Sequence, residues 1–153
     1  MSKVFTESTK VPLERTMALI QAMLSAHGAE AIVIEYQDSQ PNALAFRIPI
    51  SGQPIAFLLP CRWRSILALL RYKSYSRDDE ARARRIAWRQ VYWWLKAQFA
   101  MIDTEMVQLT EVFLPYAQYM TGETVFDRLT KNGFQQLTHQ PGGSNVQQPR
   151  PGT

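Results

Sequence analysis

The sequence predicts an α+β protein: an N-terminal helix, a three-stranded antiparallel β-meander, and a long C-terminal helix packed on the sheet, plus short helices. Three observations predict this class. Alternating apolar and polar residues form three successive strand patterns between residues 32 and 59, joined by short turn sequences. A helical pattern precedes them at 12–27. A second helical pattern, without glycine or proline, runs from 78 to 114.

The first helix is predicted over residues 12–27. Pro12 is favourable in the first turn of a helix, and Gly28 is typical of the position just past a helix end. Between them, apolar residues recur every three or four positions and so line one helix face: Leu13, Met17, Ile20 and Leu24. Residues 1–10 are polar, and we expect them to form a flexible N-terminus.

The strands are predicted to form a simple meander. A turn cluster at 38–42 and the pair Ser51-Gly52 are connections too short for parallel neighbours. One face of the sheet is apolar and must be covered by helices; it carries Ile34, Leu44, Phe46, Ile48, Ile55, Phe57 and Leu59. Glu35 and Arg47 fall on the other face, as a candidate cross-strand pair.

The long helix is predicted from 78 to 114. Ser76 is a suitable N-cap, because acidic residues follow it at the positive end of the helix dipole. One apolar stripe is expected to pack on the sheet: Trp88, Val91, Leu95, Phe99, Ile102, Met106 and Leu109. The segment 61–77 before it fits either a short helix at 66–70 or an ordered loop.

The organisation predicted from these patterns is one domain over residues 11–135. A short amphipathic helix is expected at 124–131, near its end. Residues 136–153 are rich in Pro, Gly, Gln and Ser, which predicts a disordered tail.

Catalytic and metal-binding motifs are not apparent in the sequence. The chain has one cysteine and two histidines, too few for a zinc site, and no Gly-rich phosphate loop or Gly-x-Ser-x-Gly elbow. We therefore expect no enzyme, no metal and no cofactor. No stretch has the roughly 18 apolar residues that a membrane span needs, and no signal peptide is apparent. A soluble protein of a reducing compartment is expected.

Positive charge is concentrated in residues 61–98. This segment holds ten cationic and three anionic residues, whereas the rest of the chain carries a net negative charge. A charge distribution of this kind favours a polyanionic partner or an acidic protein surface. A solvated, arginine-rich helix without any ligand is the alternative explanation.

A basic stripe with one aromatic residue is predicted on the outer face of the long helix. Its members lie within about 80° of one another on a helical wheel, given 100° per residue: Arg82, Arg85, Arg89, Trp93 and Lys96. Guanidinium groups bind phosphates and an indole stacks on a base, so the stripe is a candidate nucleic-acid surface. Arg62 and Arg64 are expected to assist. Alternatively, Trp93 and Trp94 pack against the first helix, the 61–77 segment or a second subunit.

The chain resembles a family of small uncharacterised phage and prophage proteins over about residues 11–130. The resemblance lies in the opening Val11-Pro12-Leu13-Glu14-Arg15-Thr16, in His27-Gly28-Ala29-Glu30-Ala31 and Phe57-Leu58-Leu59-Pro60, in Arg89-Gln90, and in Thr110-Glu111-Val112-Phe113-Leu114 and Gly122-Glu123-Thr124-Val125. It implies a phage or mobile-element setting in the cytoplasm of a bacterial host cell. In plan alone, a meander followed by a long helix is similar to phage single-strand annealing recombination proteins, which bind DNA in a basic groove and form rings or filaments.

Two functions are predicted from these observations. The first is non-enzymatic binding of nucleic acid, with single-stranded DNA in phage replication or recombination as the specific expectation. The alternative is a protein–protein interaction module, such as a phage-encoded inhibitor or adaptor of a host complex, which docks on an acidic partner. Homo-oligomers are compatible with either function, and a membrane partner with neither.

Overall fold

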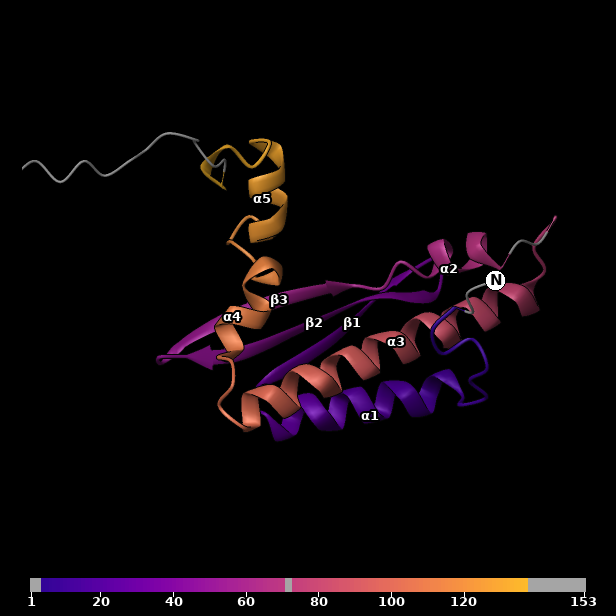
Figure 1. Cartoon of the computed structure of the whole chain (residues 1–153), viewed down its shortest axis with the longest axis horizontal. Coiled ribbons are helices and arrows are strands. Elements are labelled where there is room, and N and C mark those ends of the chain that lie inside the picture. Colours follow the sequence, from indigo (N-terminus) through magenta and orange to yellow (C-terminus); the bar gives the residue numbers. More distant parts are fainter. Residues whose placement is uncertain (1–3, 71–72, 138–153) are drawn as a thin grey trace, which may run out of the picture.

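The computed structural model describes residues 4–70 and 73–137 of the chain, and it confirms the α+β class. The sheet has the order β1-β2-β3 and consists of β1 (Ala31–Gln37), β2 (Gln40–Ile50) and β3 (Gln53–Pro60), each antiparallel to its neighbour. Two helices, α1 (Leu13–Ala26) and α3 (Arg77–Asp103), lie side by side under one face of the sheet, with their C-terminal ends together (Figure 1). The meander and its helical cover are therefore as predicted.

Both hairpins turn through two residues with left-handed backbone. Asp38 and Ser39 have φ of 51° and 63°, and Ser51 and Gly52 have φ of 50° and 78°. Two consecutive positive φ values match the right-handed twist of antiparallel strands, which explains these tight connections. The predicted turn cluster at 38–42 is too long, because β2 already begins at Gln40.

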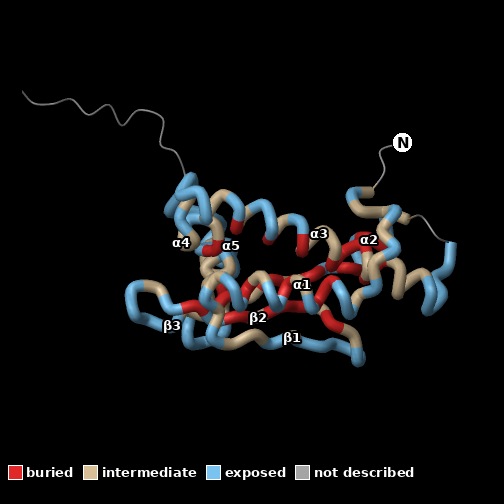
Figure 2. The backbone as a smooth tube through the Cα atoms, turned by 90° about the horizontal axis from the view of Figure 1, so that it is seen from below, coloured by how far each residue is buried: buried red, intermediate tan, exposed pale blue. Residues whose placement is uncertain are grey.

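The core lies between the sheet and the two long helices (Figure 2). Its largest fully buried side chains come from both layers: Trp88, Phe57, Phe99, Phe113, Ile20, Leu24, Leu44, Ile86 and Leu95. The predicted first helix is confirmed, and Gly28 follows its end with a φ of +93°. Ser76 caps α3 as predicted: its hydroxyl accepts from the Asp79 amide, and the Asp79 carboxylate accepts from the Ser76 amide.

The prediction of one helix from 78 to 114 is wrong. The helix ends at Asp103, where the Thr104 hydroxyl donates to carbonyls of the last turn and Glu105 takes a left-handed φ of 60°. Met106, expected in the buried stripe, is exposed instead. No glycine or proline accompanies this break, so composition did not reveal it.

After the break, the chain turns back toward β3 through short helices. These are α4 (Leu109–Phe113), a 3-10 turn η1 (Leu114–Tyr116), the predicted α5 (Val125–Lys131) and a 3-10 turn η2 (Gln135–Leu137). Phe113 anchors them, because its buried ring contacts the rings of Phe46, Phe57 and Phe99 at 5.6 to 5.9 Å. The predicted tail lies mostly outside the described residues.

The segment 61–77, for which a short helix and an ordered loop were both predicted, contains a helix, α2 (Trp63–Leu69), which packs on α3. Trp63, Ile66 and Leu67 are its buried side chains. Residues 71 and 72 lie outside the described residues. The helix therefore begins earlier than the 66–70 segment expected from the apolar run.

Candidate functional site

The outer face of α3 presents Trp93 between two cations. Trp93 is 40% exposed and lies between the buried Tyr92 and the half-buried Trp94. The guanidinium carbon of Arg89 lies 5.5 Å from a Trp93 ring centroid, and Nζ of Lys96 lies 5.0 Å away. These residues are four before and three after Trp93, and this spacing places them on the same helix face. The predicted juxtaposition of an accessible indole with basic groups is therefore present.

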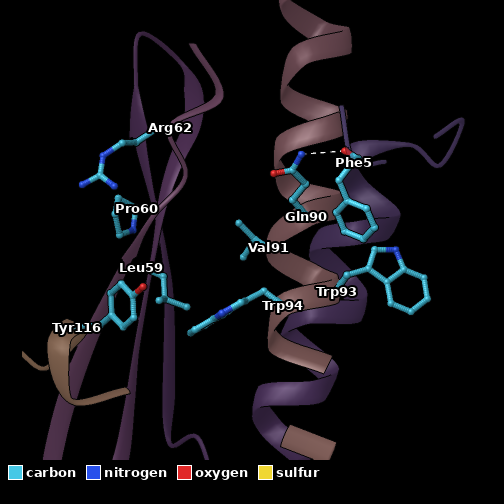
Figure 3. Close-up of a pocket in the computed structure, with 9 residues that line it drawn as sticks. All are labelled: Phe5, Leu59, Pro60, Arg62, Gln90, Val91, Trp93, Trp94 and Tyr116. Carbon is cyan, nitrogen blue, oxygen red and sulfur yellow. Dashed lines mark hydrogen bonds between the residues drawn. The ribbon is translucent and has the colours of Figure 1, made fainter. Parts of the chain in front are cut away.

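A groove of about 520 Å³ runs between α3 and β3, beside this face. Its walls are mostly aromatic and apolar, with one arginine: Phe5, Leu59, Pro60, Arg62, Gln90, Val91, Trp93, Trp94 and Tyr116. Figure 3 shows Trp94 directed across the gap toward Leu59 and Tyr116, while Trp93 points away from β3 on the Phe5 side. Successive residues of one helix thus place one indole inside the groove and one at its outer rim.

Trp94 is partly buried against the core, although its ring partners belong to neither the first helix nor the 61–77 segment. Its ring meets Phe113 and Tyr116 edge to face, with centroids 5.7 and 5.8 Å apart. Such pairs stabilise a fold beyond the area they bury. Trp93 makes one ring contact of this kind, with the neighbouring Tyr92. Trp93 is therefore partly accessible to a ligand, and a base that stacks on its ring would displace Arg89 or Lys96 from that ring.

Four predicted cations form no ion pair within the described residues, although the charge of Arg62 contributes to the lowered pKa of Asp127. No carboxylate of residues 4–70 or 73–137 lies within 4.0 Å of the charged groups of Arg62, Arg85, Arg89 or Lys96. Arg62 is exposed and lies on the β3 side of the groove, across from α3 (Figure 3). Of the described residues, Arg62 is the only cation that lines the groove, while Arg89 and Lys96 lie beside Trp93 on the outer face of α3.

Arg64 and Arg82 are already engaged. Arg82 lies 3.6 Å from a carboxylate oxygen of Glu7, and Arg64 lies 3.6 Å from one of Asp38. Arg64 also stacks over the Trp63 ring, 4.5 Å from its centroid, and lines a separate cavity near the start of α3. Arg64 therefore does not lie beside the basic stripe of α3. Because Arg82 is paired with Glu7, the part of the stripe without an ion pair runs only from Arg85 to Lys96.

Arg84 contributes to the positive charge of the segment but not to its surface. Its guanidinium is buried 4.9 Å above the centroid of the Trp63 ring and 3.9 Å from Glu80. Burial lowers the pKa of Arg84. The negative charge of Glu80 raises this pKa in part, and the positive charge of Arg64 lowers it further. Net charge along the sequence therefore overstates the charge available to a partner.

The N-terminal segment was missed as part of the site. The Thr6 hydroxyl donates to the carbonyl of Ile86 at 2.9 Å, and the Gln90 side-chain amide donates to the carbonyl of Phe5 at 2.8 Å. These bonds hold the exposed Phe5 ring at the groove beside Trp93 (Figure 3). A polar stretch with one phenylalanine carries no periodic pattern from which this docking could be predicted.

Metal ligands do not cluster in the described residues, where no group of three Cys, His, Asp or Glu side chains is placed to hold an ion. Within the same residues, no helix combines the length and apolarity that crossing a membrane requires. Comparison of the chain with protein-family models, curated proteins and solved structures finds no match in any of the three.

Proposed function

We propose that this protein is a non-enzymatic, single-stranded nucleic-acid-binding protein, and that the outer face of α3 and the adjoining groove form its binding surface. The observation that carries this proposal is the exposed indole of Trp93 held between Arg89 and Lys96. An aromatic platform flanked by cations is the combination that binds a base and its phosphates together.

Each part of the surface has a chemical role in this proposal. Trp93 stacks on an unpaired base, which is available in a single strand and not in a duplex. Arg85, Arg89 and Lys96 contact phosphates along the outer face. Arg62 contacts the same strand from the other side of the groove, so that the strand crosses between α3 and β3.

The setting in phage or mobile-element replication or recombination is part of the proposal and rests on the sequence resemblance alone. The plan of a meander and a long helix does not distinguish among the many functions that such a plan serves. The binding surface is therefore the part that experiments should address first.

Fluorescence anisotropy with a labelled oligothymidine tests this function. The full chain should bind at low salt, and affinity should fall steeply as salt rises, because phosphate contacts release counterions. Trp93→Ala should weaken binding by about 1–3 kcal/mol, the value of one stacked base. Arg89→Gln should weaken binding and also lower the salt dependence of the affinity. Arg15 is an exposed cation on α1, and Arg15→Gln should change neither the affinity nor its salt dependence.

Absence of binding at low salt, or equal affinity of Trp93→Ala and the unaltered chain, contradicts the proposal. A duplex of the same length is the matched ligand control. Preference for the duplex would rule out base stacking on Trp93.

A second candidate function is docking on an acidic protein surface. It is favoured by the mostly apolar groove and by Phe5, which is 64% exposed beside Trp93. Tryptophan and arginine are the commonest energetic anchors of protein interfaces. Capture of one protein from a host lysate that survives nuclease treatment and is lost in Phe5→Ala would support docking over nucleic-acid binding.

A further inference from the structure

The two outer edges of the sheet differ in how they are protected. Cys61, directly after β3, donates its amide to the Asn42 carbonyl of β2 at 2.8 Å, so the backbone of Cys61 faces β2. On the opposite edge of β3, the Gln118 amide donates to the Ala56 carbonyl, also at 2.8 Å. Since backbone groups alternate in direction along a strand, even-numbered residues of β3 face away from β2. Two of these are Pro54 and Pro60, which have no N–H, and Ala56 is already covered. The β3 edge is therefore closed to a further strand.

The β1 edge has none of these protections. The Glu30 amide donates to the Arg47 carbonyl at 2.9 Å, so the backbone of Arg47 faces β1. Arg47 lies opposite Ala31 in the register, and alternation then directs the backbone of Ile32 and Ile34 outward. Within residues 4–70 and 73–137, no backbone or side-chain hydrogen bond reaches these outward groups. β1 contains no proline and no lysine or arginine.

We propose that β1 pairs antiparallel with β1 of a second copy of this chain, around a twofold axis at Val33, to form a continuous six-stranded sheet. In this register Ile32 lies opposite Ile34 of the second copy, and their outward backbone groups bond to each other. Val33, which is 56% exposed in the single chain, meets Val33 of the second copy. The pairing is isologous, so it closes on two chains and leaves the protected β3 edges outermost.

Charge complementarity supports a second copy as the occupant. Within one chain Glu35 lies opposite Ala43, so the predicted pair with Arg47 does not form, and Arg47 lies 3.8 Å from Glu30 instead. No cation of the described residues lies within 4.0 Å of Glu35. In the proposed dimer, Glu35 lies opposite Ala31 of the second copy, in the same row as Arg47 of that copy.

The size of Ala31 makes this contact feasible. Glu35 and Arg47 of the second copy are two strands apart, about 10 Å between backbones. Both side chains are long, and both can close over the methyl group between them. The twofold axis generates this ion pair twice.

The chain's own C-terminal segment, 138–153, is a poor alternative occupant of the β1 edge, because it has three prolines, three glycines and one aliphatic residue.

Cysteine cross-linking of the full chain tests the register. Val33 is a non-hydrogen-bonded pair in the proposed dimer, with Cα atoms about 4.5 Å apart, a separation that suits a disulfide. The native Cys61 is buried and does not compete. Val33→Cys should form a covalent dimer rapidly under mild oxidation, whereas Ala22→Cys, exposed on α1, should not. Equal rates for the two variants would overturn the proposal.

Sedimentation equilibrium tests the association without a cross-link. The unaltered chain should reach twice the monomer mass as concentration rises. Val33→Lys places two like charges on the axis and should remain monomeric with an unchanged circular dichroism spectrum. Glu35→Arg and Arg47→Glu should each weaken the dimer, and the double variant should restore it. A monomeric unaltered chain, a dimeric Val33→Lys, or a double variant as weak as the single ones would contradict this dimer.

Discussion

His27 and Asp103 join the C-terminal ends of α1 and α3, with imidazole Nε2 2.9 Å from a carboxylate oxygen. The imidazole also stacks on Phe99 at 4.1 Å, and its Nδ1 lies 2.7 Å from the carbonyl of Met23. One side chain thus connects two helix ends that are 76 residues apart in sequence.

His27→Ala should therefore lower the free energy of unfolding by about 1–2 kcal/mol, since it removes the stacking on the buried Phe99 and the hydrogen bonds to Asp103 and Met23. A double-mutant cycle with Asp103→Asn in urea isolates the contact between the two side chains. We expect a coupling energy of about 0.5–1.5 kcal/mol. Additive effects of the two changes would show that the loss comes from the contacts with Phe99 and Met23 and not from Asp103.

Truncation of the two adjacent tryptophans of α3 should change the free energy of unfolding by different amounts. Trp94→Ala removes two edge-to-face ring contacts in the groove and should cost about 3 kcal/mol of stability. Trp93→Ala removes an exposed side chain and should change stability by less than about 1 kcal/mol. Thermal or urea denaturation of both variants measures this. An unstable Trp93→Ala would indicate that the outer indole stabilises the fold. Weaker nucleic-acid binding by this variant would then not show that Trp93 contacts the ligand.

Cys61 should be chemically inert in the folded chain. Burial raises the pKa of its thiol to about 12. An ordinary cysteine has a pKa of about 8.5, so at pH 8 folding lowers the thiolate fraction by roughly a thousandfold. A thiol reagent such as dithionitrobenzoate should react slowly in buffer and quickly in urea. Fast reaction in buffer would show that the segment after β3 opens readily.

The same burial makes stability fall in alkali. The pKa of Cys61 is higher in the folded than in the unfolded chain, so its contribution is fully present below about pH 8.5. It is lost as the pH rises toward 12, because only the unfolded chain ionises easily. Cys61→Ala should remove this part of the pH dependence. An identical alkaline profile in Cys61→Ala would assign the dependence to other groups.

α5 should loosen in acid. Glu123 lies 2.9 Å from Lys131 and 3.4 Å from Arg128, and the hydrogen bond from Lys131 is the main cause of its lowered pKa. A lowered pKa stabilises the fold above the unfolded value and loses that contribution as the pH falls through the folded value. The protection factors of the α5 amides, which are the intrinsic exchange rates divided by the observed rates, should therefore fall in acid in the unaltered chain. Glu123→Gln should have low protection factors already at neutral pH and show little further change.

The elements that could be predicted are those with strong local patterns. Alternation and short turn sequences identified the meander, and Ser76 with its acidic neighbours identified the start of α3. The end of α3 could not be predicted, because Glu105 breaks the helix without any residue that favours a left-handed backbone. The candidate site was predicted in part: periodicity placed Trp93 outward with Arg89 and Lys96 but did not reveal the carboxylates that engage Arg82 and Arg64.

The sequence by itself determined the α+β class, the order of the first helix, the three strands and the long helix, and the face of α3 that carries its cations, because each depends on spacing along one segment. Only the tertiary structure decided which of those cations remain unpaired, that Trp94 and not Trp93 packs inward, and that Phe5 reaches the groove. These outcomes depend on distances between segments that are far apart in the chain, such as Glu7 from Arg82 and Asp38 from Arg64. Local periodicity carries no information about such distances.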